Sequence, residues 1–389
     1  MTLTIRAYNV LFGDCILITW HEQDGPHHAW VDFGNFHNDA NAVFASVYED
    51  VLKRTGGNID LVVVTHRHLD HLEGFHSLRK RFAKDFSIDR LWHAHVSKGS
   101  DDVFELADQS MRALLPASAL DVEAGLLGRI YHNNHYITTK DRMHAVADEL
   151  PAQSAHAVHR ETKLSEIKPA GLKRMKVEVL APERDSSIYL RPLEEALSAV
   201  DSVTSSLQRA SSGGSVTGRR RRVTGDELRL AEWQNRLEGL ADFARLRRHL
   251  RSGGLNFLAA VDRTRNNTSI VLRLTYGATK VLLTGDAEEG SWETIKKKKP
   301  RSLEATVVKV GHHGSINASP SWSFEKVMVS RKEANAVILS TDPSRFTGEN
   351  EVPKREVLEG WQARLTSTKR FLRTDKVRRG KSVSLTIEE

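Results

Sequence analysis

Three histidines and one aspartate lie within a stretch of six residues in the segment Thr65-His66-Arg67-His68-Leu69-Asp70-His71. Imidazole nitrogens and carboxylate oxygens are the ligands that zinc and similar divalent metals take in proteins. His66 and His68 are two positions apart, so on an extended segment their side chains point the same way. A turn after His68 would bring Asp70 and His71 to a second point. The segment therefore predicts a metal site in which one loop supplies ligands to two ions.

Two more segments place ligand-type side chains directly after an apolar run. Asp286 follows residues 281–284, and His312 and His313 follow residues 307–310, each after one glycine. In open α/β sheets, binding sites gather at the carboxyl ends of strands. A single Gly-Asp after a strand usually marks only a turn, and a histidine pair alone could be structural. Three such segments in one chain instead indicate a common site.

The runs that precede these residues predict a layered α/β fold. Residues 61–64 are wholly apolar and mostly β-branched, as in a strand buried on both faces. Residues 41–54 place their apolar side chains on one helical stripe, which Gly56-Gly57 ends. The N-terminal order of strand, strand, helix and strand is typical of layered α/β proteins. Further strands are expected at 88–96, 177–180, 270–276, 280–284, 305–310, 336–340 and 382–387, and helices at 101–115 and 356–365.

The middle of the chain has the composition of an insertion between two strand-rich halves. Residues 211–218 resemble a flexible Gly/Ser linker, and residues 219–222 are four consecutive arginines. Residues 227–250 are a strongly charged helix candidate. We therefore expect the N-terminal half of one fold at 1–182, a helical, basic insertion at 183–262 and the C-terminal half of the same fold at 263–389.

These motifs resemble the metallo-β-lactamase fold of metal-dependent hydrolases, and within it the hydrolase domain of ComEC-type DNA-uptake proteins. The His-x-His-x-Asp-His loop matches the signature of the fold, and Lys309-Val310-Gly311-His312-His313-Gly314-Ser315 is the most distinctive further match. The resemblance covers about 1–100, 176–182 and 264–389. It implies an αββα sandwich with a largely helical insertion. Weaker matches are Phe12-Gly13-Asp14-Cys15, Val31-Asp32-Phe33-Gly34, Asn266-Asn267-Thr268-Ser269, Leu283-Thr284-Gly285-Asp286, Asn350-Glu351-Val352-Pro353 and Arg373-Thr374-Asp375.

The resemblance also implies a role for each ligand. His66 and His68 would hold the first ion, and Asp70 and His71 the second. Asp286 would bridge both ions and act with Asp70 in catalysis. His312 would complete the second site, with His313 as the alternative, and Asp32 would orient the loop without binding metal. The ions are expected to be Zn²⁺, with Mn²⁺ as the alternative.

The sequence departs from the wider fold at the first ion. Many members carry a further histidine ligand before the bridging aspartate, where this chain has Asn266 and Asn267. The first ion would then be held by fewer ligands, with the Asn266 oxygen as a candidate. His93 and His95 form a second His-x-His, which either lines the mouth of the pocket or is structural.

Composition limits the classes of protein to consider. The chain has 389 residues, 39% of them hydrophobic and 28% charged, which is typical of a globular protein. Its single cysteine excludes a disulfide scaffold and a cysteine-rich zinc module. It has no run of about 18 apolar residues and no signal-peptide pattern at its N-terminus. We therefore expect a cytoplasmic protein without a membrane span.

A two-metal site suits phosphodiester hydrolysis, because it activates a bridging water and stabilises charge on both the attacking and the leaving oxygens. The resemblance to a DNA-handling branch, the pI of about 9.4 and the arginine-rich runs at 219–222 and 245–251 favour nucleic acid as the substrate. Basic runs beside charged helices are also common as solvated faces.

Two alternative functions stay open. One is a small-molecule hydrolase acting on a phosphorylcholine-type ester, a cyclic nucleotide or a lactone. The other is a protein with a weakened site that binds a protein partner through the insertion.

Overall fold

The computed structural model describes residues 2–35, 40–117, 133, 135–196, 257–346, 348 and 351–388. The chain divides by its internal contacts into two compact units. The smaller unit takes in Gly99–Tyr136, which the sequence analysis assigns to the N-terminal half, together with Leu190–Thr264. The arginine-rich runs at 219–222 and 245–251 lie outside the described residues. The larger unit comprises Met1–Lys98, Ile137–Tyr189 and Arg265–Glu389.

The larger unit contains two β-sheets. The first has the strand order β13-β1-β2-β3-β4-β5-β6, and the second has the order β12-β11-β10-β9-β8-β7. Strands β3 to β6 run parallel to one another, and so do β9 to β12. Each sheet therefore has a parallel part whose carboxyl ends share one edge. The strands are β1 (Thr2–Tyr8), β2 (Cys15–Glu22), β3 (Gly25–Phe33), β4 (Asn58–Val64), β5 (Ser87–Ala94), β6 (Ala152–Val158), β7 (Lys176–Ala181), β8 (Val271–Tyr276), β9 (Thr279–Leu283), β10 (Val307–Lys309), β11 (Ala336–Leu339), β12 (Phe371–Arg373) and β13 (Ser382–Glu388).

The apolar runs at the centre of each sheet bury both of their faces. In β4, Leu61 and Val63 pack in a core that contains residues of both sheets, while Val62 and Val64 pack in a second core that contains residues of α1 and α2. This division follows from the two-residue period of a strand. Because a single core contains side chains from both sheets, the sheets pack face to face.

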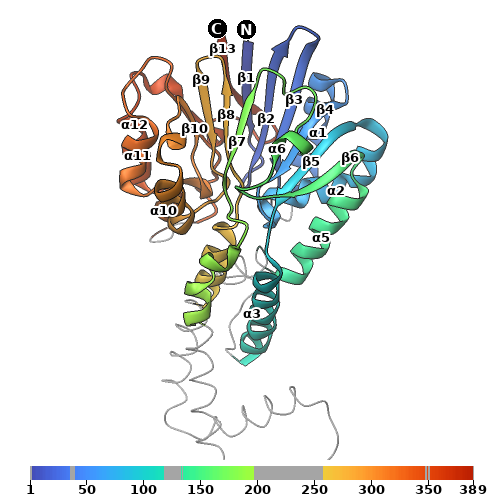
Figure 1. Ribbon diagram of the computed structural model, residues 1–389, viewed down its shortest axis with the longest axis vertical. Coiled ribbons are helices and arrows are strands. Elements are labelled where there is room, and N and C mark those ends of the chain that lie inside the picture. Colours follow the sequence, from blue (N-terminus) through green and yellow to red (C-terminus); the bar gives the residue numbers. More distant parts are fainter. Residues whose placement is uncertain are drawn as a thin grey trace, which may run out of the picture. The chain divides into compact units, whose positions relative to one another are not determined.

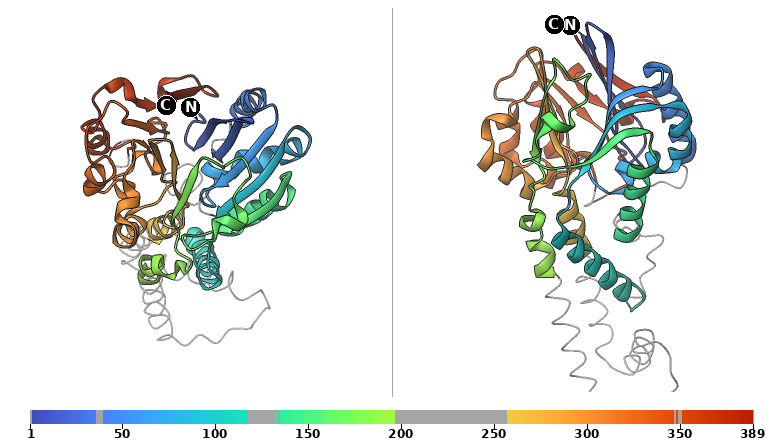
Figure 2. Two further views of the ribbon diagram at one scale, coloured as in Figure 1. Left: turned by 45° about the horizontal axis from the view of Figure 1, so that its top comes forward. Right: turned by 45° about the vertical axis from the view of Figure 1, so that its right-hand side comes forward.

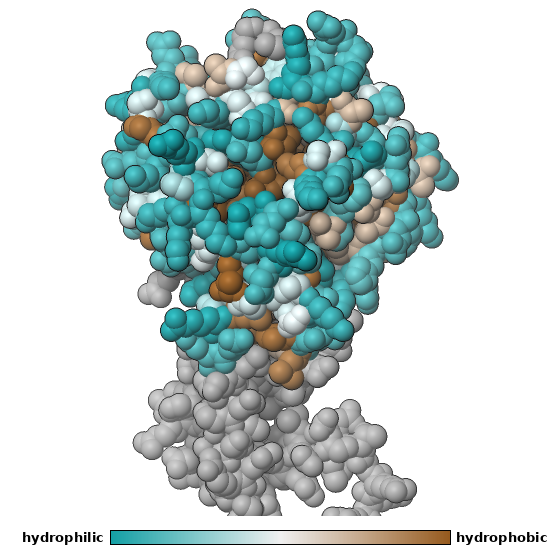
Figure 3. All heavy atoms as spheres, in the orientation of Figure 1, coloured by the Kyte–Doolittle hydropathy of each residue, from teal (hydrophilic) through white to brown (hydrophobic). Residues whose placement is uncertain are grey.

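Helices cover the outer face of each sheet (Figures 1 and 2). The first sheet packs against α1 and α2, and the second against α10, α11 and α12. The order of layers is helix, sheet, sheet, helix, so the αββα fold expected from the sequence is confirmed. On the face drawn in Figure 3 the described surface is mostly hydrophilic, because apolar side chains lie between the layers. The helices are α1 (Ala40–Thr55), α2 (Leu69–Asp85), α3 (Lys98–Ala117), α5 (Tyr136–Glu149), α6 (Leu164–Ile167), α10 (Glu289–Lys298), α11 (Ser321–Val327) and α12 (Arg355–Gln362).

Within the smaller unit, the structure describes most of α3 and two helical segments at residues 191–196 and 257–264. Among the described helices of the whole chain, none combines the length and the apolar character needed to cross a bilayer.

Candidate metal centre

The histidine loop begins where β4 ends. Thr65 follows the last residue of the strand, and His68 directly precedes α2. His66 and His68 are both 1% exposed, and the Nε2 atom of each ring is buried without a hydrogen-bond partner. A buried polar atom without a partner is rare in proteins because it loses its bonds to water. Two such imidazole nitrogens on one loop are well suited to bind a metal ion.

The first turn of α2 carries Asp70 and His71. The helix dipole favours a carboxylate at this end of a helix. Gly34 lies against the same turn, and a Cβ atom there would come within 2.2 Å of Asp70 C and of His71 N. Only glycine allows this approach, which fixes the start of α2 against the end of β3.

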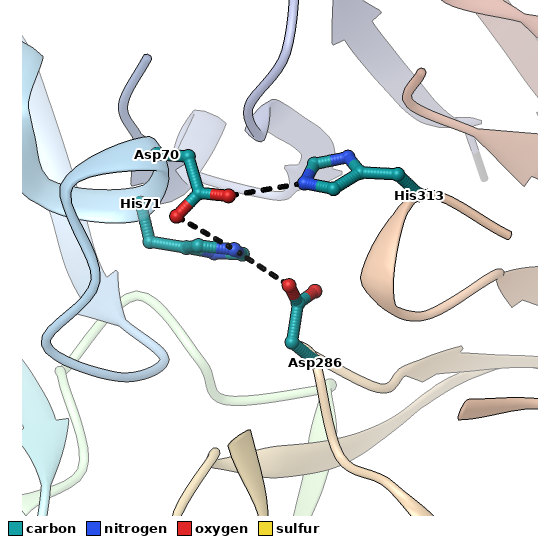
Figure 4. Close-up of side chains that lie close together, drawn as sticks. All are labelled: Asp70, His71, Asp286 and His313. Atoms are coloured by element: carbon teal, nitrogen blue, oxygen red, sulfur yellow. Dashed lines mark hydrogen bonds and ion pairs between the residues drawn. The ribbon is translucent and has the colours of Figure 1, made fainter. Parts of the chain in front are cut away.

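Asp70 and His71 meet two residues from the C-terminal half of the chain (Figure 4). His313 Nε2 lies 3.1 Å from Asp70 Oδ2, and His71 Nε2 lies 3.1 Å from Asp286 Oδ2. The four residues are buried, and each offers a ligand atom within 4.8 Å of those of the others. Two imidazoles and two carboxylates that converge in this way can hold a divalent cation. We call Asp70, His71, Asp286 and His313 the four-residue group.

The two histidines after β10 lie in different surroundings. His312 is the residue expected to complete the second site, with His313 as the alternative, and it is the His313 ring that lies beside Asp70. His312 instead lies with its Nδ1 3.0 Å from Glu288 Oε1, and its side chain is 23% exposed. Both histidines have positive φ, 43° for His312 and 53° for His313. The chain therefore makes a left-handed turn after the two residues that follow β10, and this turn brings the second ring to Asp70.

Asp32 lies behind the histidine loop and holds it by three hydrogen bonds. Its carboxylate accepts from the backbone N of Thr65 at 2.7 Å, from Thr65 Oγ1 at 2.7 Å and from His71 Nδ1 at 2.8 Å. Because Nδ1 of His71 donates to Asp32, Nε2 is the atom that faces the four-residue group. Asp32 itself has φ of 54°, a left-handed conformation that non-glycine residues rarely adopt.

Burial and charge give the histidines different protonation states. Burial lowers the pKa of His66 and of His68 well below the usual value, so both rings are neutral and able to bind metal. Burial also opposes the charge of His71, but the nearby carboxylates, Asp286 above all, raise its pKa well above the usual value. Burial opposes ionisation of Asp70, yet His71 and His313 hold its pKa at about 2.

Lys309 and Asp14, which are not among the site residues expected from the sequence, complete the interior of the site. Lys309, the last residue of β10, is 1% exposed, and its ammonium contacts the carboxylate of Asp14. It also lies 3.4 Å from the carbonyl oxygen of Gly285 and 3.6 Å from Asp286 Oδ1. Burial by itself would lower the pKa of Lys309, but Asp14 and Asp286 raise it. The signal in the sequence is a single lysine within an apolar strand.

The other candidate residues lie outside the four-residue group. Asn266 donates from Nδ2 to Glu288 Oε1 at 2.9 Å, beside His312. His93 is half-buried on β5, and burial is the main cause that lowers its pKa to about 4. The ring of His95 lies 5.1 Å from that of His159, measured between centroids.

No family model matches the chain, and no curated protein matches it. Among solved structures, the chain is similar to the crystal structure of the metallo-β-lactamase fold protein YhfI from Bacillus subtilis. The two share 9% identity, with 99% of this chain and 100% of that chain covered and a TM-score of 0.41. At this identity and TM-score the likeness carries no argument about the site, so the chemistry of the site has to come from its own side chains.

Proposed function

We propose that the protein is a metal-dependent hydrolase that cleaves phosphodiester bonds, with nucleic acid as its substrate. The observation that carries this proposal is the buried four-residue group, whose ligand atoms lie within 4.8 Å of one another. The partnerless Nε2 atoms of His66 and His68 supply a second set of ligands, and the ring centroid of His66 lies 4.1 Å from that of His71. The resemblance of the motifs to ComEC-type hydrolase domains and the sequence pI of about 9.4 support nucleic acid.

The residues divide into two sets of ligands. His66 and His68 would hold one ion, and the four-residue group would hold the other. Divalent ions bound there would lower the pKa of a water molecule and stabilise charge on the oxygens of a scissile phosphate. The mixture of imidazoles and carboxylates suits Zn²⁺, with Mn²⁺ as the alternative.

The two carboxylate oxygens of Asp286 have different surroundings. Its Oδ1 accepts a hydrogen bond from the backbone N of His312 at 2.9 Å, and its Oδ2 lies 3.1 Å from His71 Nε2. The first contact fixes the carboxylate, and the second oxygen faces the ligands. Asp286 Oδ2 is therefore the atom we assign as the metal ligand of this residue.

The test compares wild type with Asp70→Ala/His71→Ala, each with added Mn²⁺ or Zn²⁺. The substrates are plasmid, single-stranded DNA, RNA, a phosphorylcholine-type ester and a lactone. His156→Ala, a change on the edge strand β6, is the matched control and should behave as wild type. We expect cleavage of the polymers by wild type alone, falling steeply as salt rises because binding to phosphates releases counterions.

Three results would contradict the proposal in different ways. Equal cleavage by wild type and the double variant would show a contaminating nuclease. Turnover of the ester or lactone without cleavage of nucleic acid, and without dependence on salt, would favour the small-molecule hydrolase. Absence of metal binding by wild type in a calorimetric titration would favour a protein with a weakened site that binds a protein partner through the insertion.

A further inference from the structure

Lys309 occupies a position that ordinarily belongs to an apolar residue. Val307, two residues earlier on β10, packs in the core between the sheets, and the two-residue period directs Lys309 to the same side. An ammonium removed from water is strongly unfavourable unless it is paired and hydrogen-bonded. A lysine that is 1% exposed at this position therefore needs specific partners.

The partners of Lys309 come from both halves of the chain. On one side its ammonium contacts the carboxylate of Asp14. The backbone N of Asp14 in turn donates a hydrogen bond to the carbonyl oxygen of Asp70 at 2.9 Å. On the other side it lies 3.4 Å from the oxygen of Gly285 and 3.6 Å from Asp286 Oδ1. One ammonium thus connects the segment that carries Asp70 to the segment that carries Asp286.

A second observation concerns the charge around this ammonium. Asp14, Asp32 and His71 each offer a ligand atom within 4.8 Å of the others, a spacing that could hold a cation. The Oδ2 atom of Asp14, which lies 3.8 Å from His71 Nδ1, is the atom that Lys309 contacts. The ammonium therefore supplies positive charge to a group of buried carboxylates that would otherwise attract a further ion.

We propose that Lys309 is a positioning residue of the metal centre. Its ammonium is a fixed internal cation that orients the Asp286 carboxylate, so that Oδ1 faces the protein interior and Oδ2 faces the ligands. Through Asp14 it also holds the segment that carries Asp70 close to the segment that carries Asp286. This inference rests on the proposed function, because it takes the four-residue group to be a metal site.

The test removes the ammonium without changing the net charge. Asp14→Asn/Lys309→Met replaces both members of the ion pair, so no charge is left buried without a partner. Calorimetric titration of the metal-free protein with Zn²⁺ or Mn²⁺ alone gives the dissociation constant. We expect the double variant to bind the metal about 10–100-fold more weakly, the range seen when the outer partners of metal ligands are changed.

Matched variants separate positioning from loss of stability. Val337→Ala, in the core on the helix-covered side of the second sheet, should lower the unfolding midpoint but leave the dissociation constant of the metal unchanged. Lys297→Met, an exposed lysine of α10, should change neither quantity. Asp14→Asn/Lys309→Gln keeps a hydrogen bond between the two segments and decides the question if the methionine variant does not fold.

The outcomes distinguish the two proposals. A double variant that is folded and binds metal as tightly as wild type would overturn the role of Lys309 and leave the proposed function intact. A Val337→Ala variant that loses metal affinity as much as the double variant would show that stability alone explains the loss, and would also overturn it. A wild-type protein that binds neither ion would overturn the proposed function itself.

Discussion

His312 and His313 are neighbours in the chain with different surroundings. His313 is fully buried beside Asp70, whereas the His312 side chain is 23% exposed beside Glu288. Changing a residue that only orients a metal ligand costs about 10–100-fold in affinity, so removing a ligand should cost at least as much. We therefore expect His313→Ala to weaken Zn²⁺ or Mn²⁺ binding by tenfold or more, and His312→Ala to leave it nearly unchanged, in calorimetric titrations. The reverse order would show that His312 is the ligand.

The protonation of His71 leads to a second prediction at the scale of single residues. In the metal-free protein the carboxylates, Asp286 foremost, outweigh burial and raise the pKa of His71, so the ring carries a proton at neutral pH. A metal ion binds only the neutral ring and must displace that proton. Affinity should therefore rise with pH until the pH exceeds the raised pKa of His71, and fall as the pH drops below it.

Calorimetry in two buffers of different ionisation enthalpy measures this coupling. We expect about one proton to be released for each ion that binds the four-residue group. Asp70 should contribute little to the count, because its pKa of about 2 leaves it already ionised. Binding without proton release, or an affinity that does not change with pH, would show that His71 is neutral before the metal arrives.

Gly34 gives a prediction at the scale of elements, since it sets the distance between β3 and α2. A Cβ atom at Gly34 would meet backbone atoms of Asp70 and His71, which cannot move without shifting the ligands. We expect Gly34→Ala to lower the free energy of unfolding by about 1–3 kcal/mol, as overpacking does, and to weaken metal binding. Urea unfolding and metal titration measure the two effects.

Gly99 provides the matched control for this change. It lies in α3, its φ is not positive, and a Cβ atom there would meet nothing within 4 Å. Gly99→Ala should therefore leave metal binding unchanged and either preserve or slightly raise stability, because alanine restricts the unfolded chain. If Gly34→Ala behaves in the same way as Gly99→Ala, the close approach of β3 and α2 does not position the ligands.

Much of the fold could be predicted from the sequence because the central strands are buried on both faces. The run 61–64 is wholly apolar, and the run 305–310 is apolar apart from Thr306 and Lys309. The first lies in strand β4, and the second contains the shorter strand β10. Strand β6 was not predicted, since its small and polar residues alternate between exposed and half-buried positions over most of its length. Helix α2 was also not predicted, although it supplies Asp70 and His71.

The location of the site could be predicted from the sequence, but the choice among its side chains could not. Asp286 and His313 follow the parallel neighbours β9 and β10, whose carboxyl ends share an edge. The histidine loop follows β4 in the other sheet, and it reaches the same place because the two sheets pack face to face. The choice between His312 and His313 depends on a left-handed turn that spacing does not reveal. The pairing of Lys309 with Asp14 spans 295 positions in the sequence, and a lysine in isolation suggests an exposed side chain.

At the scale of the whole molecule, the four-residue group joins two distant parts of the chain. Asp70 and His71 precede the described parts of the smaller unit in sequence, and Asp286 and His313 follow them. In the unfolded chain these pairs are more than 200 positions apart, since Asp286 is 215 residues after His71 by the difference 286 − 71. A metal ion that binds all four residues therefore binds the folded larger unit and not the unfolded chain.

Removal of the metal should for this reason lower the stability of the larger unit. An ion that binds only the folded state adds RT ln(1 + [L]/Kd), which is about 2.7 kcal/mol at a free concentration of 100 Kd. We expect the thermal unfolding midpoint to rise with each increase in free Zn²⁺ or Mn²⁺ and to fall when a chelator is added. The Asp70→Ala/His71→Ala variant should show a much smaller dependence, because it lacks two of the four ligands and keeps only the pair His66 and His68. A midpoint that responds equally in wild type and variant would mean that the ion stabilises the protein from another site.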